Sequence, residues 1–336
     1  MLFQAWATTD TGMHDEYLDT LQRILRYGLF SNSYKFSLMR ALADLSIDRN
    51  SNGLVISKLS LARKFVEYYW PLEVRYHLRQ AAVPNKNPVV MRLIKREVIS
   101  LKLPNEFSFS KFTEEHGSRA TKIFSNVANQ AFRDVIPRFH NIRNGEALSP
   151  ALFEECAEGL RLAKGAKDLL GKHQRVVELL AIGGWVKFTE QYSSAPRLFE
   201  KIEGSVRRKS LNKYRNYLSA LHGEQCLYCG VEIGDDFHVD HFVPWVFVAE
   251  DKLWNLVPTC PNCNSAKSSN LPRSELLVIM CARNAGIRDS RSLPSNLRKD
   301  MKDWPSSEAL ETHMRSLYSR CEAEGFSVWT PTAIVN

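Results

Sequence analysis

Apolar residues recur at helical spacing along the first part of the chain. In residues 15–30 leucine and isoleucine return every three or four positions, and residues 34–47 repeat the pattern, so we expect two amphipathic helices. Residues 54–72 begin with β-branched residues and then become helical, with Ser57 as the expected N-cap and Pro71 as the expected stop. The pattern predicts a mainly α-helical N-terminal region.

Helical spacing returns in residues 150–203, where Gly183-Gly184 is expected to interrupt a helix. Two further helices are expected near the C-terminus, at 274–283 and 306–323. The breaks divide the chain into three expected regions: a helical N-terminal region for DNA or partner recognition, a mainly helical middle region, and a C-terminal domain, at residues 1–104, 105–204 and 205–336. Arginine and lysine interleaved with the first helices leave two interpretations open, a helix-turn-helix-like DNA reader or a plain helical core.

The chain is basic, and its charge is unevenly distributed. It has 336 residues and a formal net charge of +8; residues 1–206 carry +7 of this excess and residues 207–336 carry +1. This composition is that of a globular protein, and a basic excess suits a polyanionic partner. No apolar run is long enough to cross a membrane, and the N-terminus lacks the pattern of a secretory signal, so we expect a cytoplasmic protein without a membrane partner.

A concentrated basic run, SVRRKSLNKYRNYLSAL at residues 205–221, precedes the cysteines. We expect it to be a helix whose cations bind a nucleic-acid backbone. The expected nucleic-acid-binding residues in this run are Arg207, Arg208, Lys209, Lys213 and Arg215.

Two Cys-x-x-Cys pairs follow. Cys226 and Cys229 form the first pair, and Cys260 and Cys263 form the second, 31 positions after Cys229. Each pair presents two thiolates to one tetrahedral ion, so we expect a structural zinc with four sulfur ligands.

Between and just after these pairs lie polar residues at particular spacings. His238-Val-Asp240-His241 is followed by Asn255, 14 residues after His241, and by Asn264, 9 residues after Asn255. This arrangement resembles the HNH endonucleases, also called ββα-metal or His-Me finger nucleases, in their four-cysteine zinc form. The final Asn264 matches the H-N-N variant, which is also seen in the HNH domain of CRISPR effector nucleases.

The chemistry of these side chains agrees with phosphodiester hydrolysis. A neutral His241 imidazole can act as general base. Asp240 and Asn264 offer oxygens that suit a catalytic Mg²⁺ or Mn²⁺, and such an ion can stabilise the leaving oxygen. Lys267, one helical turn after Asn264, is expected to meet a phosphate. The resemblance implies that Asn255 helps to orient His241, that one metal ion is used, and that products carry 5′-phosphate and 3′-hydroxyl ends.

The expected fold is thus a mainly α N-terminal region joined to a small α+β ββα-metal (HNH) nuclease domain with a structural zinc. The resemblance, together with the basic charge, implies metal-dependent endonuclease cleavage of DNA, with duplex DNA as the expected substrate. A role in bacterial restriction or antiphage defence is implied by the resemblance alone. The other interpretations are a catalytically silent zinc module that acts as a specificity subunit, a nuclease that is active only within a complex with a defence-system partner, and a nuclease that acts on RNA. Double-strand cleavage with one metal per site would favour a homodimer.

Overall fold

The computed structural model describes residues 8–47, 55–83, 86–143, 145–222, 225–234, 237–290 and 293–331. The chain divides into two compact units. The first comprises Met1–Ser193 and Leu198–Gly204, and the second comprises Ser194–Arg197 and Ser205–Asn336. Within the described residues no helix is both long enough and apolar enough to cross a membrane.

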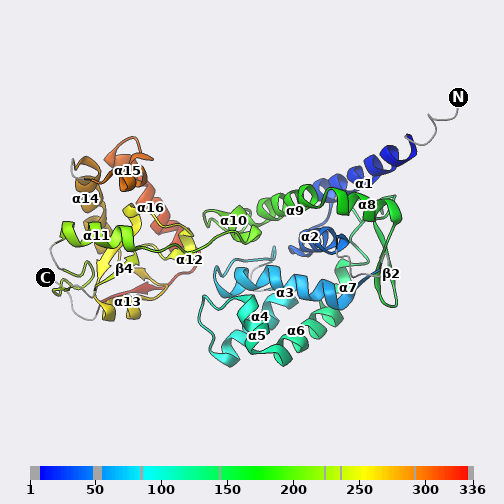
Figure 1. Ribbon diagram of the computed structural model, residues 1–336, viewed down its shortest axis with the longest axis horizontal. Helices are drawn as coiled ribbons and strands as arrows, with labels where there is room; N and C mark the ends of the chain where they lie inside the picture. The colour runs from blue at the N-terminus through cyan, green and yellow to red at the C-terminus, as the bar shows by residue number, and fades with distance from the viewer. Residues whose placement is uncertain are drawn as a thin grey trace. The chain divides into compact units, whose positions relative to one another are not determined.

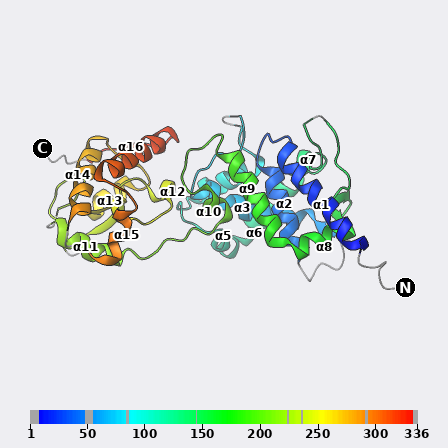
Figure 2. The same ribbon diagram turned by 90° about the horizontal axis from the view of Figure 1, so that it is seen from above.

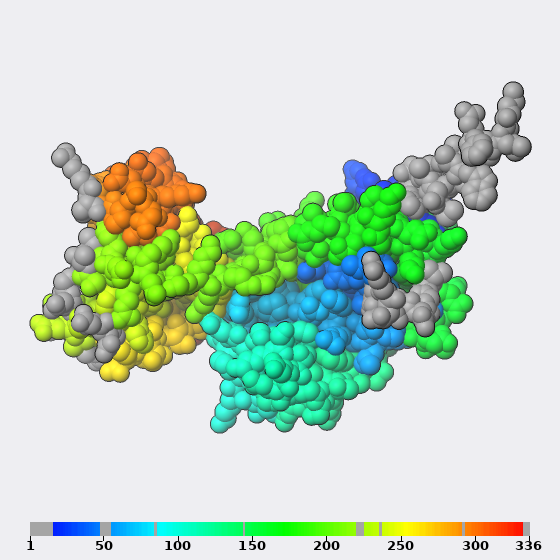
Figure 3. Space-filling view, viewed as in Figure 1, coloured from blue at the N-terminus to red at the C-terminus, as the bar shows by residue number. Residues whose placement is uncertain are grey.

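The first unit is built mainly from helices (Figure 1). Helix α2 packs on α9, and α3 packs on α4 and α6; Figure 3 shows α8 and α9 in green on the surface of this unit. The helices are α1 (Thr8–Tyr27), α2 (Tyr34–Ser46), α3 (Lys58–Val74), α4 (Val89–Leu101), α5 (Phe109–Glu115), α6 (Gly117–Gln130), α7 (Phe132–Val135), α8 (Lys164–Lys172), α9 (Gln174–Thr189) and α10 (Leu198–Glu203).

A small antiparallel sheet completes the first unit. Its strand order is β1-β3-β2, and the strands are β1 (Val55–Ser57), β2 (Phe153–Cys156) and β3 (Gly159–Leu162). The expected helix at the start of residues 150–203 is therefore wrong, because this stretch forms a hairpin. Gly159 has a φ of +150° and a Cβ there would lie 2.1 Å from the Ile56 carbonyl oxygen, so only glycine allows β3 to approach β1.

Three local predictions meet different outcomes. The Ser57 N-cap is confirmed, since its hydroxyl accepts the Ser60 N–H. Pro71 does not stop α3, which continues to Val74 and buries Leu72 on the way; the burial offsets the hydrogen bond that proline cannot donate. Gly183-Gly184 does not interrupt α9.

The second unit contains the ββα arrangement that the spacing predicted. Strand β4 (His238–His241) pairs antiparallel with β5 (Leu256–Thr259), and α13 (Pro261–Lys267) follows. Trp245 in α12 (Trp245–Val248) and Trp254 beside β5 are 3% and 2% exposed and form part of its core. The expected fold class, a mainly α region with a small zinc-type ββα domain, is therefore confirmed.

Further helices of the second unit lie beside this motif (Figures 1 and 2). The basic run is helical only in its second half, because residues 205–211 form neither helix nor strand and α11 begins at Asn212. The remaining elements are α11 (Asn212–His222), α12 (Trp245–Val248), the 3-10 turn Leu253–Asn255, β6 (Leu271–Pro272), α14 (Glu275–Asp289), α15 (Ser295–Lys302), α16 (Ser307–Ala323) and β7 (Val328–Trp329).

Candidate metal and catalytic site

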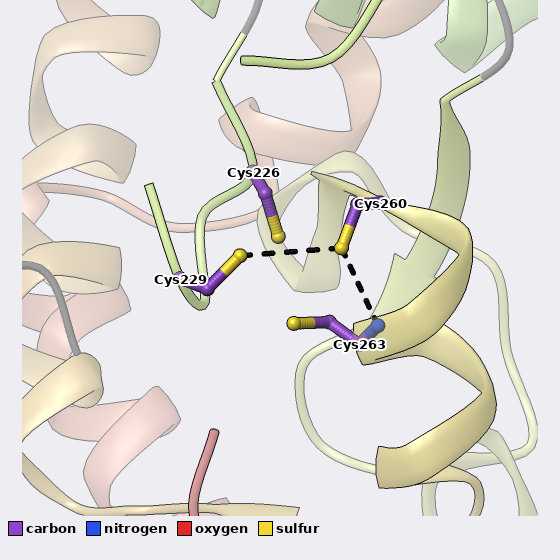
Figure 4. Close-up of side chains that lie close together, drawn as sticks. All are labelled: Cys226, Cys229, Cys260 and Cys263. Carbon is purple, nitrogen blue, oxygen red and sulfur yellow. Dashed lines mark hydrogen bonds between the residues drawn. The ribbon is translucent and has the colours of Figure 1, made fainter. Parts of the chain in front are cut away.

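Four cysteine thiols converge at one edge of the ββα motif (Figure 4). The Sγ atoms of Cys226, Cys229, Cys260 and Cys263 all lie within 4.8 Å of one another. Those of Cys229 and Cys260 are 4.0 Å apart, whereas the sulfurs of a tetrahedral zinc site, with Zn–S of about 2.3 Å, are about 3.8 Å apart. The four side chains therefore fit one zinc ion with a closed coordination sphere.

Tight backbone geometry presents each pair of thiols. In the first pair Gly230 N donates to Cys226 O at 2.8 Å, and Gly230 has a φ of +68°, which glycine adopts without steric cost. In the second pair Cys260 is the N-cap of α13, and its Sγ accepts the Cys263 N–H at 3.4 Å. One pair thus comes from a loop and the other from a helix start.

Burial and hydrogen bonding shift the pKa values of Cys226, Cys229 and Cys263. Burial raises the pKa of Cys229 and of Cys263. Burial also acts to raise the pKa of Cys226, but hydrogen bonds from the Thr259 hydroxyl and from backbone groups outweigh it and lower this pKa to about 7. Because zinc binds thiolates, filling the site releases protons, and zinc affinity must fall as the pH falls.

Asp240 and His241 end β4 with different side-chain partners. Asp240 Oδ2 accepts the Tyr228 hydroxyl at 2.8 Å and lies 2.9 Å from Lys267 Nζ. His241 is 7% exposed, and its Nε2 lies 3.0 Å from Asp251 Oδ1. Neighbouring strand residues point to opposite faces. Asp240, the expected cation ligand, and His241, the expected base, are therefore adjacent in the chain but contact different residues.

Asn255 connects the two ends of the motif's loop. It is 1% exposed; its Oδ1 accepts the Val243 N–H at 2.8 Å and its Nδ2 donates to Val243 O at 2.9 Å. Its carbonyl also accepts the Phe242 N–H at 2.8 Å. These bonds hold the chain immediately after His241 against the start of β5.

Asn264 lies in the first turn of α13 and faces β4. Its Nδ2 lies 2.9 Å from Nδ1 of His238, a contact that is exposed to solvent. Asn264 thus meets His238, and no hydrogen bond joins it to Asp240 or to the His241 ring among the described residues.

Lys267 does not have the solvent-exposed position that the expected phosphate contact requires. It is 0% exposed, and its ammonium donates to His241 O at 2.8 Å and lies 2.9 Å from Asp240 Oδ2. A buried ammonium is costly to leave unpaired. Lys267 therefore joins α13 to β4 instead of reaching into solvent.

Of the five expected nucleic-acid-binding cations in the basic run, four are exposed and one is half-buried. Lys209 contacts the loop that faces His241, because its backbone N–H donates to Asp251 Oδ2 at 3.3 Å. The Arg208 guanidinium lies over the Trp245 ring at 4.7 Å and that of Arg215 over the Phe237 ring at 4.8 Å. The exposed cations are Arg207, Arg208, Lys209 and Lys213.

Sequence reasoning missed Asp251. Burial acts to raise its pKa, but the hydrogen bond and charge of His241 outweigh burial, and the pKa lies below its usual range. Its carbonyl accepts the Tyr214 hydroxyl at 2.7 Å. No spacing rule signals this residue, because it lies in the loop before β5 and reaches His241 only through the fold.

The C-terminal helices, in which the sequence showed no recognisable chemistry, support this loop. Asp300 in α15 is 7% exposed; its Oδ2 accepts the Leu253 N–H at 3.0 Å and the Tyr214 hydroxyl at 2.9 Å. Asn284 in α14 donates to Trp254 O at 2.7 Å. The loop that carries Asp251 is thus tied to α11, α14 and α15.

Comparison with known proteins identifies this part of the chain. Residues 226–270 match the family model described as HNH endonuclease. The matched segment begins at Cys226, contains both cysteine pairs, and includes β4, β5 and α13. Searches of curated proteins and of solved structures found no match.

Proposed function

We propose, from the HNH endonuclease match over residues 226–270, that this chain is a metal-dependent endonuclease that hydrolyses phosphodiester bonds in DNA. The observation that carries the proposal is the ββα motif itself, which holds Asp240 and His241 at the end of β4 and Asn264 at the start of α13 beside a four-thiol cluster. A zinc module that only binds nucleic acid has no chemical need for a carboxylate and an imidazole at these positions.

In this proposal His241 is the general base. Its Nε2 faces the Asp251 carboxylate at 3.0 Å, so the neutral ring carries its proton on Nε2 and its lone pair on Nδ1. Nδ1 then accepts the proton of the attacking water. Asp251 is a positioning residue that sets the ring's tautomer and orientation.

Asp240 and Asn264 are the proposed holders of the catalytic cation, Mg²⁺ or Mn²⁺. A carboxylate and an amide oxygen are ligands that suit such ions. When bound, the ion supplies Lewis-acid stabilisation of charge on the phosphate and the leaving oxygen. Asn255 acts indirectly, since its paired hydrogen bonds to Val243 hold the chain that carries His241.

The basic segment before α11, residues 207–209, is the proposed path for the DNA backbone. It is exposed, and the Lys209 N–H contacts the same Asp251 that faces His241. A phosphate bound along this segment would therefore approach the proposed base. We propose duplex DNA as substrate, and a homodimer when both strands are cut; a role in restriction or antiphage defence rests on the family resemblance alone.

One observation favours a second candidate, a catalytically silent specificity subunit that binds nucleic acid. His241 is 7% exposed and its Nε2 is already engaged by Asp251. A ring in this position can serve the fold without reacting. The two candidates differ in whether the isolated chain cuts DNA.

The test is incubation of purified, zinc-loaded protein with supercoiled plasmid and Mg²⁺ or Mn²⁺, with EDTA as a control. We expect nicked and linear products from the wild type, none from His241→Ala, and undiminished cutting from the matched variant His173→Ala in the first unit. DNA binding by His241→Ala should remain. Binding without cutting by the wild type would instead support the specificity subunit.

A further inference from the structure

Two pairs of side chains bridge β4 and α13. His238 and Asp240 lie two apart on β4 and so share one face of the strand, while Asn264 and Lys267 lie three apart on α13 and so share one side of the helix. Asn264 Nδ2 lies 2.9 Å from His238 Nδ1, and Lys267 Nζ lies 2.9 Å from Asp240 Oδ2. The imidazole, the carboxylate and the amide are therefore all carried by the adjoining sides of β4 and α13.

The Asp240 carboxylate is held by one oxygen only. Oδ2 accepts the Tyr228 hydroxyl and faces the Lys267 ammonium. Among the residues that the structure describes, no hydrogen bond or ion pair falls on Oδ1. Because Oδ2 is anchored by two buried groups, Oδ1 is the oxygen left for a cation.

The contact between His238 and Asn264 has the dimensions of two neighbouring ligands. An octahedral Mg²⁺ or Mn²⁺ with metal-ligand distances of about 2.1 Å separates adjacent ligand atoms by about 3.0 Å. The observed separation is 2.9 Å. A 180° rotation of the Asn264 amide exchanges Oδ1 and Nδ2, so that Oδ1 lies next to His238. The exposed His238 Nδ1 accepts the present contact and therefore has a lone pair that can bind a cation.

We infer, on the basis of the proposed function, that His238 Nδ1 is a third protein ligand of the divalent cation, together with Asp240 Oδ1 and Asn264 Oδ1. The Lys267 ammonium offsets the single carboxylate charge, so electrostatic attraction alone gives a low affinity for a cation. A third ligand is therefore needed to raise that affinity. Mn²⁺ belongs to the first-row transition series and accepts a nitrogen ligand beside oxygens, whereas Mg²⁺ is a hard ion that is bound by oxygens. The site should therefore prefer Mn²⁺ to Mg²⁺ because of His238.

Metal binding without DNA tests this inference directly. Zinc-loaded full-length protein is titrated with Mn²⁺, the free ion is followed by electron paramagnetic resonance, and Mg²⁺ is used as competitor. We expect His238→Ala to lose about tenfold in Mn²⁺ affinity, and to lose much less for Mg²⁺, as befits removal of one nitrogen ligand. The matched variant His173→Ala should bind both ions as the wild type does.

A second measurement detects the His238 ligand without relying on a change in Mn²⁺ affinity. Pulsed electron paramagnetic resonance of bound Mn²⁺ should show coupling to a ¹⁴N nucleus of imidazole in the wild type, and this coupling should vanish in His238→Ala. Equal Mn²⁺ affinity of wild type and His238→Ala, or an unchanged ¹⁴N signal, overturns the inference. Plasmid cutting is measured separately. If Mn²⁺ binds through His238 but the protein cuts no DNA, the nuclease proposal is wrong and the proposed ligand set remains supported.

Discussion

The His241 imidazole and the Asp251 carboxylate form a close buried pair: Nε2 and Oδ1 are 3.0 Å apart, and each side chain is 9% exposed. The second carboxylate oxygen of Asp251 accepts the Lys209 N–H at 3.3 Å. One side chain thus contacts both the proposed base and the proposed DNA path. This arrangement makes the orientation of His241 dependent on a residue outside the β4 motif.

Asp251→Asn should slow plasmid cutting about 100-fold, because an amide cannot hold the ring with its proton on Nε2 as a carboxylate does. The loss should fall on kcat, with KM for DNA little changed. The ¹⁵N spectrum of the His241 ring should also change its balance of tautomers, an effect that simple destabilisation would not produce. Asp289→Asn, which changes an exposed residue of the same unit, is the control. If Asp251→Asn has the kcat of the wild type, Asp251 does not position the His241 ring.

Cys260→Ser should abolish zinc binding and unfold the second unit. Its Sγ caps α13 as well as joining the thiol cluster, and a small domain held by a structural zinc loses much of its folding free energy without the metal. Metal content and limited proteolysis measure the two effects. Cys156→Ser in the first unit should keep one zinc per chain, and a zinc-bound, protease-resistant Cys260→Ser protein would contradict the assignment.

Replacing the exposed Lys209 and Lys213 by alanine should weaken DNA binding without changing the folded stability of the second unit. Each lost phosphate contact should reduce the slope of log Kd against log salt by about 0.9. Lys122→Ala, an exposed cation of the first unit, is the comparison. If the double variant has the same salt slope as the wild type, these residues do not contact the DNA backbone.

Gly183 and Gly184 in α9 should respond oppositely to alanine. A Cβ on Gly184 would lie 2.8 Å from Phe36 Cε1 and 2.9 Å from Leu25 Cδ2, whereas a Cβ on Gly183 meets nothing within 4 Å. Gly184→Ala should therefore destabilise the first unit by about 1–3 kcal/mol, and Gly183→Ala should stabilise it by up to about 1 kcal/mol. Denaturant unfolding of the two variants, side by side, measures the difference.

These glycines illustrate where sequence patterns predict the fold and where they do not. Helical spacing located α1, α2, α14 and α16, because amphipathic periodicity is a local property. The low helix propensity of Gly184 favours a helix break, yet α9 continues through it. Phe36 of α2 packs so closely against Gly184 that there is no room for a side chain, and the packing position therefore requires glycine. Likewise Pro71 lies inside α3, where burial of the following residues outweighs one missing hydrogen bond.

The sequence by itself determined the zinc cysteines and the order Asp240, His241, Asn255 and Asn264, because those side chains lie on consecutive short elements whose spacing is set by one strand pair and one helix. Only the tertiary structure decided how they are held. The buried Lys267 ammonium, the Asp251 partner of His241 and the Asp300 support of that loop all depend on contacts between separate elements of the fold. No local periodicity encodes such contacts, since they arise when separate elements pack into one core.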